Sequence, residues 1–158
     1  MFILDLCKAL KKEKIQYAIV GGYAVALHGA VRGTIDIDLV ISLDEKSFIK
    51  TEELLKGLGL QPRLPVSAKQ VFQFREEYIQ NRHLIAWSFH DVNRPIKQVD
   101  IIITHDFKKM KAAVIELHGV KISVASIESL IEMKKKSARP QDLEDVKSLL
   151  EIQKNGKA

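Results

Sequence analysis

The order of apolar and polar residues predicts strands and helices in turn along the chain. The strands are expected at residues 16–20, 35–41, 84–89 and 98–103. The first ends at Gly21-Gly22, and the last two are separated by the turn-like segment 91–95, which is typical of a hairpin. A second, small hairpin is expected over residues 113–123, turning at His118-Gly119.

Helices are predicted where apolar residues recur on one helical face. They are expected at residues 4–12, 23–28, 44–57 and 106–110, and in two further segments that begin at 126 and 140. Asp44 and Ser126 are suited to cap a first turn, and Pro140 is suited to the first position of the final helix. The final helix is expected to turn these residues inward: Leu143, Val146, Leu149 and Leu150.

The stretch 62–82 is polar and irregular, with a short helix expected around 68–74. The alternation of elements predicts a mixed α/β (α+β) fold. A chain of 158 residues, 46% of them hydrophobic and 28% charged, fits one globular domain over residues 1–158.

Charge and composition narrow the class of partners and the compartment. The formal charge of +5 favours anionic partners, although many solvated surfaces look similar. No apolar run approaches the ~20 residues of a membrane-spanning helix. The N-terminus lacks the order of a secretory signal, and the lone Cys7 can make no intrachain disulfide, so a cytoplasmic protein is expected.

The alternating segment 35–41 places two carboxylates on one face of a strand. Side chains two positions apart on a strand point the same way, so Asp36 and Asp38 share a face about 7 Å apart. Two such groups repel each other unless a cation lies between them. Magnesium suits the pair, because it binds through a few carboxylates and takes its other ligands from water and phosphates. The alternative is that both acids face solvent on a half-exposed sheet.

Two further features bear on the same chemistry. Asp100 is a single acid inside an apolar run, where an unpaired charge would be costly, and it joins the pair if its strand lies alongside. Gly21-Gly22 stands where a strand turns into a helix, which lets the backbone approach a phosphate. Taken alone, a Gly-Gly pair more often marks only a tight turn.

These residues together resemble a known family. Gly21-Gly22, followed by thirteen residues and then Asp36-Ile37-Asp38, is similar to the minimal pattern of the DNA polymerase beta-like nucleotidyltransferase superfamily, with Asp100 as the third acid. The resemblance implies the nucleotidyltransferase fold, a central, mixed, mostly antiparallel sheet flanked by helices. It also implies that Asp36, Asp38 and Asp100 bind Mg²⁺ or Mn²⁺, that Asp100 is the base, and that the glycines hold the triphosphate.

The C-terminal third resembles a subgroup of that superfamily. Lys134, followed by Arg139 and Asp142, is similar to a segment of the bacterial group that includes the AbiEii-type toxins. By this resemblance Lys134 reaches the triphosphate, and Asp142 orients Lys134 or Arg139. Arg32 and Thr34, just before the acidic strand, are further candidates for phosphate contact. A surface lysine and an ordinary helix start are the alternative reading.

The predicted activity is metal-dependent transfer of a nucleoside monophosphate from a triphosphate such as ATP to an acceptor hydroxyl. The acceptor is left open between RNA, including tRNA, a protein and a small molecule, and a toxin–antitoxin role with a cognate partner is one setting. The alternative is a catalytically inactive nucleotidyltransferase fold that serves as a binding or antitoxin partner. The five histidines show no pairing at helical ligand spacing, so a zinc site is not expected.

Overall fold

A computed structural model of the chain describes residues 1–34, 36–94 and 97–156. The predictions that fall on Ile35 and Pro95 lie outside the described residues. The helices are α1 (Phe2–Lys12), α2 (Gly21–Leu27), α3 (Glu45–Gly57), α4 (Ala68–Gln73), α5 (Arg75–Arg82), the 3-10 turn η1 (Phe107–Lys109), α6 (Ile127–Ser137) and α7 (Pro140–Gly156). The strands are β1 (Tyr17–Val20), β2 (Ile37–Ile41), β3 (Leu60–Pro62), β4 (Ala86–Asp91), β5 (Gln98–Ile102), β6 (Ala112–Leu117) and β7 (Val120–Ala125).

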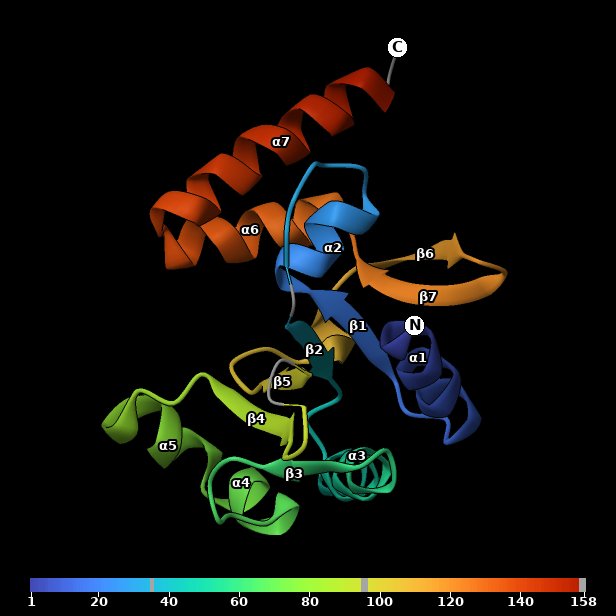
Figure 1. The fold of residues 1–158 in the computed structure, drawn as a ribbon. Helices are drawn as coiled ribbons and strands as arrows, with labels where there is room; N and C mark the ends of the chain where they lie inside the picture. The colour runs from blue at the N-terminus through green and yellow to red at the C-terminus, as the bar shows by residue number, and fades with distance from the viewer. Residues whose placement is uncertain (35, 95–96, 157–158) are drawn as a thin grey trace.

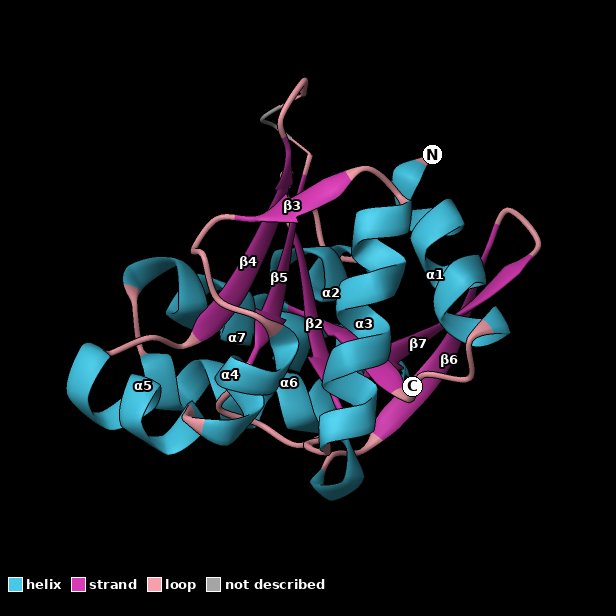
Figure 2. Ribbon diagram, turned by 90° about the horizontal axis from the view of Figure 1, so that it is seen from below, coloured by secondary structure: helices cyan, strands magenta, loops and turns pink. Residues whose placement is uncertain are grey.

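The strands form one sheet in the order β3-β4-β5-β2-β1-β7-β6. Four neighbouring pairs are antiparallel, whereas β1 with β7 and β2 with β5 are parallel. Helices α2, α6 and α7 lie on one side of the sheet, and α3 and α4 lie on the other (Figure 1). Figure 2 views the molecule from below, with α3 and α4 in front of the strands. The predicted fold, a mixed and mostly antiparallel sheet flanked by helices, is confirmed.

Alternation along the central strands separates the core from the opposite face of the sheet. Trp87 and Phe89 of β4 are buried, whereas Ser88 between them is half-buried. Phe48 of α3 stacks on Trp87 with ring centroids 5.8 Å apart, and Trp87 meets Phe89 edge-on at 4.7 Å. Both β4 aromatics therefore belong to the core.

Several element boundaries differ from the predictions. Strand β2 begins at Ile37, so Asp36 precedes the strand instead of lying within it. In the stretch 62–82, the short helix predicted around 68–74 is α4, which the capping box of Ser67 and Gln70 starts, and the part predicted as irregular holds a further helix, α5. Strand β3, which ends at the first residue of this stretch, was not predicted. None of the helices among the described residues is long and apolar enough to cross a membrane.

The final helix departs from its predicted orientation. Leu143 and Leu150, expected to face inward, are 50% and 46% exposed. Asp142 and Asp145 are buried in their place, beside Val146 and Leu149. The inward face of α7 is therefore partly ionic, because cationic side chains from other elements meet these acids there.

The aromatic stack allows a test of the core. Replacing Phe48 by Ala should destabilise the protein by about 3–5 kcal/mol, because it removes a fully buried ring and leaves a cavity against Trp87. Chemical denaturation followed by circular dichroism measures the change. Phe74→Ala is the control, since Phe74 is 43% exposed and should cost far less. Equal losses in the two variants would contradict the assigned core.

Candidate active site

Two carboxylates meet at the centre of the sheet. Strands β2 and β5 run parallel, with Asp38 directly beside Asp100. In the other direction Asp38 lies opposite Val20, the last residue of β1. Neighbouring strands lie about 4.8 Å apart, so this register brings both acids next to the Gly21 turn.

Gly21 occupies a backbone position that a larger residue would not fit. Its φ is +69°, in the left-handed region that favours glycine. A Cβ at this position would lie 2.1 Å from Oδ2 of Asp38. The absence of a side chain therefore lets the turn approach the carboxylate.

The loop after α2 folds back over the second glycine. A Cβ on Gly22 would meet the guanidinium of Arg32 and the Cβ of Thr34, each at 3.2 Å. The hydroxyl of Thr34 donates to the carbonyl of Asp36 at 3.4 Å. The predicted residues Arg32 and Thr34 are thus brought to the glycine turn.

Burial and neighbouring negative charges disfavour the ionised forms of Asp38 and Asp36. Burial raises the pKa of Asp38 to about 7, together with the charge of Asp100, a hydrogen bond with it and the charge of Asp36. Lys134 opposes this shift in part. Partial burial and the charge of Asp100 also raise the pKa of Asp36, against the opposing charge of Arg63. Such a site favours a cation, which would relieve the repulsion.

The acids do not by themselves complete a metal site. Over residues 1–34, 36–94 and 97–156, no three His, Cys, Asp or Glu side chains are grouped closely enough to hold a metal ion. This donor set fits magnesium, which is commonly bound by one or two carboxylates plus phosphates of a substrate.

A second ionic cluster lies between α6 and α7. Lys134 is only 7% exposed, and its Nζ lies 2.8 Å from Asp145 and 3.5 Å from Asp142. Nε of Arg32 pairs with Asp145 at 3.1 Å, and Nε of Arg139 pairs with Asp142 at 2.9 Å. Three cations thus surround two buried carboxylates, which leaves the cluster with one excess positive charge.

Asp142 remains ionised within this cluster. Burial would raise its pKa, but hydrogen bonds from Arg139 and Ser137 lower it to about 2. The hydrogen bond and charge of Asp142 in turn raise the pKa of Arg139. Asp142 and Arg139 therefore keep their charges at neutral pH.

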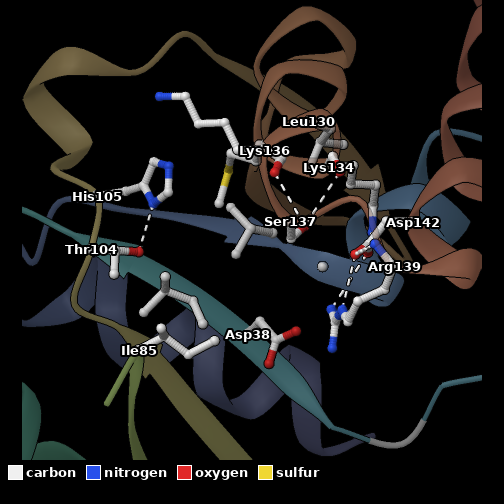
Figure 3. Close-up of a pocket in the computed structure, with 14 residues that line it drawn as sticks. Asp38, Ile85, Thr104, His105, Leu130, Lys134, Lys136, Ser137, Arg139 and Asp142 are labelled. Carbon is white, nitrogen blue, oxygen red and sulfur yellow. Dashed lines mark hydrogen bonds and ion pairs between the residues drawn. The ribbon is translucent and has the colours of Figure 1, made fainter. Parts of the chain in front are cut away.

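A cavity of about 270 Å³ joins Asp38 to this cluster. Asp38 and Gly21 line it together with Lys134, Arg139 and Asp142. Figure 3 shows Thr104 and His105 at the end of the cavity opposite Arg139 and Asp142. The hydroxyl of Thr104 lies 2.9 Å from Nδ1 of His105. The cavity thus has a cationic end at Lys134 and Arg139, and a second end lined by the ring of His105 and by Lys136.

All nine residues singled out in the sequence lie around this region. Lys134 and Asp142 are buried, in contrast to the alternative of a surface lysine and an ordinary helix start. Sequence reasoning gave no role to Asp145, which contacts two cations; its signal is its place in the same C-terminal segment, three residues after Asp142. It also missed Arg63 and Gln98, which lie beside the acids.

The comparisons with known proteins identify a family and a shared fold. Residues 3–154 match the model of a family described as nucleotidyltransferase of unknown function (DUF6036). No curated protein matches the sequence.

Solved structures share the fold at low identity. A nucleotidyltransferase-like antigen from Paracoccidioides brasiliensis is 21% identical, with a TM-score of 0.61 over 96% of this chain and 74% of its own. ANT(2″)-Ia in complex with adenylyl-2″-tobramycin is 13% identical, with a TM-score of 0.61 over 94% and 85%. Lincomycin-bound LnuA, a lincosamide adenylyltransferase, is 18% identical, with a TM-score of 0.60 over 96% and 94%.

The close approach of Gly21 to Asp38 generates a first prediction for this site. Gly21→Ala should destabilise the fold by at least about 1–2 kcal/mol, because an L-residue is strained at positive φ and its Cβ meets the carboxylate. Thermal unfolding measures the loss. Gly57→Ala is the matched control, since its Cβ meets no described atom within 4 Å. An unchanged midpoint for Gly21→Ala would contradict the geometry.

The raised pKa of Asp38 predicts a pH-dependent effect. The folded protein keeps a proton on Asp38 up to about pH 7, whereas the unfolded chain releases it near the usual 3.8, so stability falls as pH rises between these values. With a chelator present, Asp38→Asn should therefore melt several degrees above the wild type at about pH 8. The advantage should vanish near pH 4. A difference of the same size at both values would contradict the assignment.

Proposed function

Because the chain belongs to the DUF6036 family of nucleotidyltransferases, we propose that it transfers a nucleoside monophosphate from a triphosphate to an acceptor hydroxyl, with Asp36, Asp38 and Asp100 as the catalytic acids. The observation that carries this proposal is the pairing of Asp38 with Asp100 directly beside the Gly21 turn. Nucleotidyl transfer needs carboxylates and a phosphate site in contact, and this register supplies both.

The cationic end of the cavity suits the triphosphate. Gly21 and Gly22 leave room for phosphate oxygens to approach the backbone, and Lys134 and Arg139 line the same cavity. Arg32 and Thr34 cover Gly22 and are proposed as further phosphate contacts. Asp142 holds Arg139 and Lys134 in place through an ion pair with each. A lysine and an arginine at this end offset phosphate charge.

Asp36, Asp38 and Asp100 are the residues that would hold Mg²⁺ or Mn²⁺, with phosphate oxygens of the substrate completing the ligands, since no three acids of the described residues are grouped closely enough to hold an ion alone. The fit rests on donors that are all carboxylate oxygens, and on the burial and charge repulsion that raise the pKa of Asp38. When bound, a divalent cation supplies neutralisation of charge on the phosphates.

The proposed reaction is an in-line displacement at the α-phosphorus. The acceptor oxygen forms a bond to that phosphorus while the bond to the bridging oxygen breaks, and pyrophosphate leaves toward Lys134 and Arg139. Asp100 accepts the proton of the acceptor hydroxyl. The attacking and leaving oxygens lie on opposite sides of the phosphorus in this geometry.

The proposed acceptor belongs to one of three classes: a small molecule, an RNA or a protein. ANT(2″)-Ia and LnuA are described with an adenylylated aminoglycoside and with lincomycin, which favours a small-molecule acceptor. The net charge of +5 favours RNA, including tRNA, and a protein acceptor is the third class. A toxin–antitoxin role with a cognate partner belongs to the same proposal.

Each radiolabelled nucleoside triphosphate should be incubated with the protein, magnesium and a cell lysate separated into RNA, protein and small-molecule fractions. Label is expected in one fraction only, which identifies both nucleotide and acceptor class. If no fraction is labelled and calorimetry finds no magnesium-dependent triphosphate binding, the proposal fails and the inactive binding or antitoxin role is favoured.

Loss of the acids provides the mutational test. Asp36→Ala and Asp38→Ala should each reduce transfer by at least about 10³-fold while the far-ultraviolet spectrum is retained, because each removes a carboxylate that would hold the cation whose charge balances the phosphates. Asp5→Ala is the matched control, since Asp5 is an exposed acid of α1. Full activity in either of the first two variants is incompatible with the proposed roles.

A further inference from the structure

The carboxylate of Asp100 accepts hydrogen bonds from a neighbouring side-chain amide. Nε2 of Gln98 donates to both carboxylate oxygens of Asp100, at 2.9 and 3.2 Å. The two residues stand two positions apart on β5 and therefore point to the same face of the sheet. Both side chains are only half-buried, so this contact forms at the edge of the site and outside the hydrophobic core.

The amide of Gln98 is itself oriented by an arginine. Nη2 of Arg63 donates to Oε1 of Gln98 at 2.6 Å. A guanidinium only donates hydrogen bonds, so the oxygen of Gln98 faces Arg63 and the nitrogen faces Asp100. The backbone of Arg63 is anchored as well, because its N–H donates to the carbonyl of Ser88 at 2.9 Å. The chain Arg63–Gln98–Asp100 thus has one consistent direction of donation.

Arg63 also acts on Asp36 through its charge, which opposes the rise in the pKa of that acid. Its direct contact is with Gln98, and through Gln98 it is linked to Asp100. Neither Arg63 nor Gln98 takes part in the ionic cluster of Lys134, Arg32 and Arg139. The chain Arg63–Gln98–Asp100 is therefore separate from the cationic end of the cavity.

We propose that Gln98 and Arg63 are positioning residues that fix the orientation of the Asp100 carboxylate for nucleotidyl transfer. This inference rests on the function proposed above. A carboxylate on a half-exposed strand would otherwise rotate, and both the acceptor proton and a shared cation require one orientation. Groups that orient the ligands of a metal in this way typically contribute 10–100-fold to metal affinity or activity.

The test compares two matched substitutions. Gln98→Met keeps the length of the side chain and removes the amide, and Gln73→Met makes the same change at an exposed position of α4. Gln98→Met should lower kcat roughly 10–100-fold and raise the magnesium concentration for half-maximal rate, with little change in the KM for the triphosphate. Gln73→Met should match the wild type in all three quantities.

Substitutions of Arg63 provide the second part of the test. Arg63→Met should reproduce the loss of Gln98→Met, and Arg63→Lys should recover part of it, because an ammonium can still donate to Oε1. The double variant Arg63→Met/Gln98→Met should be no worse than either single variant, since both act through one orientation. Unchanged melting midpoints separate this effect from unfolding.

The possible results separate a failure of the positioning role from a failure of the proposed nucleotidyl transfer. A wild-type protein that transfers label, together with a Gln98→Met variant of equal kcat and magnesium dependence, would overturn the positioning role and leave the proposed function intact. A loss in Gln98→Met that is confined to the KM for the triphosphate also overturns it. A wild-type protein that neither transfers label nor binds triphosphate with magnesium contradicts both.

Discussion

The arrangement of the site depends on holding two like charges together. Strands β2 and β5 run parallel and in a register that sets Asp38 beside Asp100. Burial, together with the charge of Asp100, raises the pKa of Asp38 to about 7. Such a pair weakens the folded state near neutral pH, and the surrounding sheet has to compensate for it. The hydrophobic face formed by Trp87, Phe89 and their neighbours anchors the same strands from the other side. The strain is typical of a site whose charges are balanced only by a ligand.

The cationic side of the site is organised differently. Lys134 and its partners Asp142 and Asp145 are buried, and the two ion pairs hold Lys134 against α7. Arg32 ties the loop over Gly22 to the same cluster through Asp145. The proposed phosphate site is therefore a preformed ionic network, whereas a cation would relieve the repulsion between the acids. Binding of a triphosphate with its metal would satisfy both halves at once, because it supplies negative charge to one and positive charge to the other.

Local signals in the sequence account for the parts of the site that were predicted. Gly21-Gly22 and the pair of aspartates lie within one short segment, so their spacing alone placed them together. The neighbourhood of Asp100 required the parallel pairing of β2 with β5, which no local pattern specifies. Leu143 and Leu150 were assigned inward because they are apolar, yet the buried Lys134 draws Asp142 and Asp145 to that face. Arg63 was not predicted as a site residue, because it follows a strand of only three residues and lies at the start of a stretch whose sequence pattern is irregular.

The most direct measurement is a crystal structure with Mn²⁺ and a triphosphate analogue whose α–β bridge cannot be cleaved. The account predicts an anomalous manganese peak bonded to Asp36, Asp38 and a phosphate oxygen, with the triphosphate lying over Gly21 and Gly22 and reaching Lys134. Manganese bound away from these aspartates, or a triphosphate bound away from the glycine turn, would contradict it.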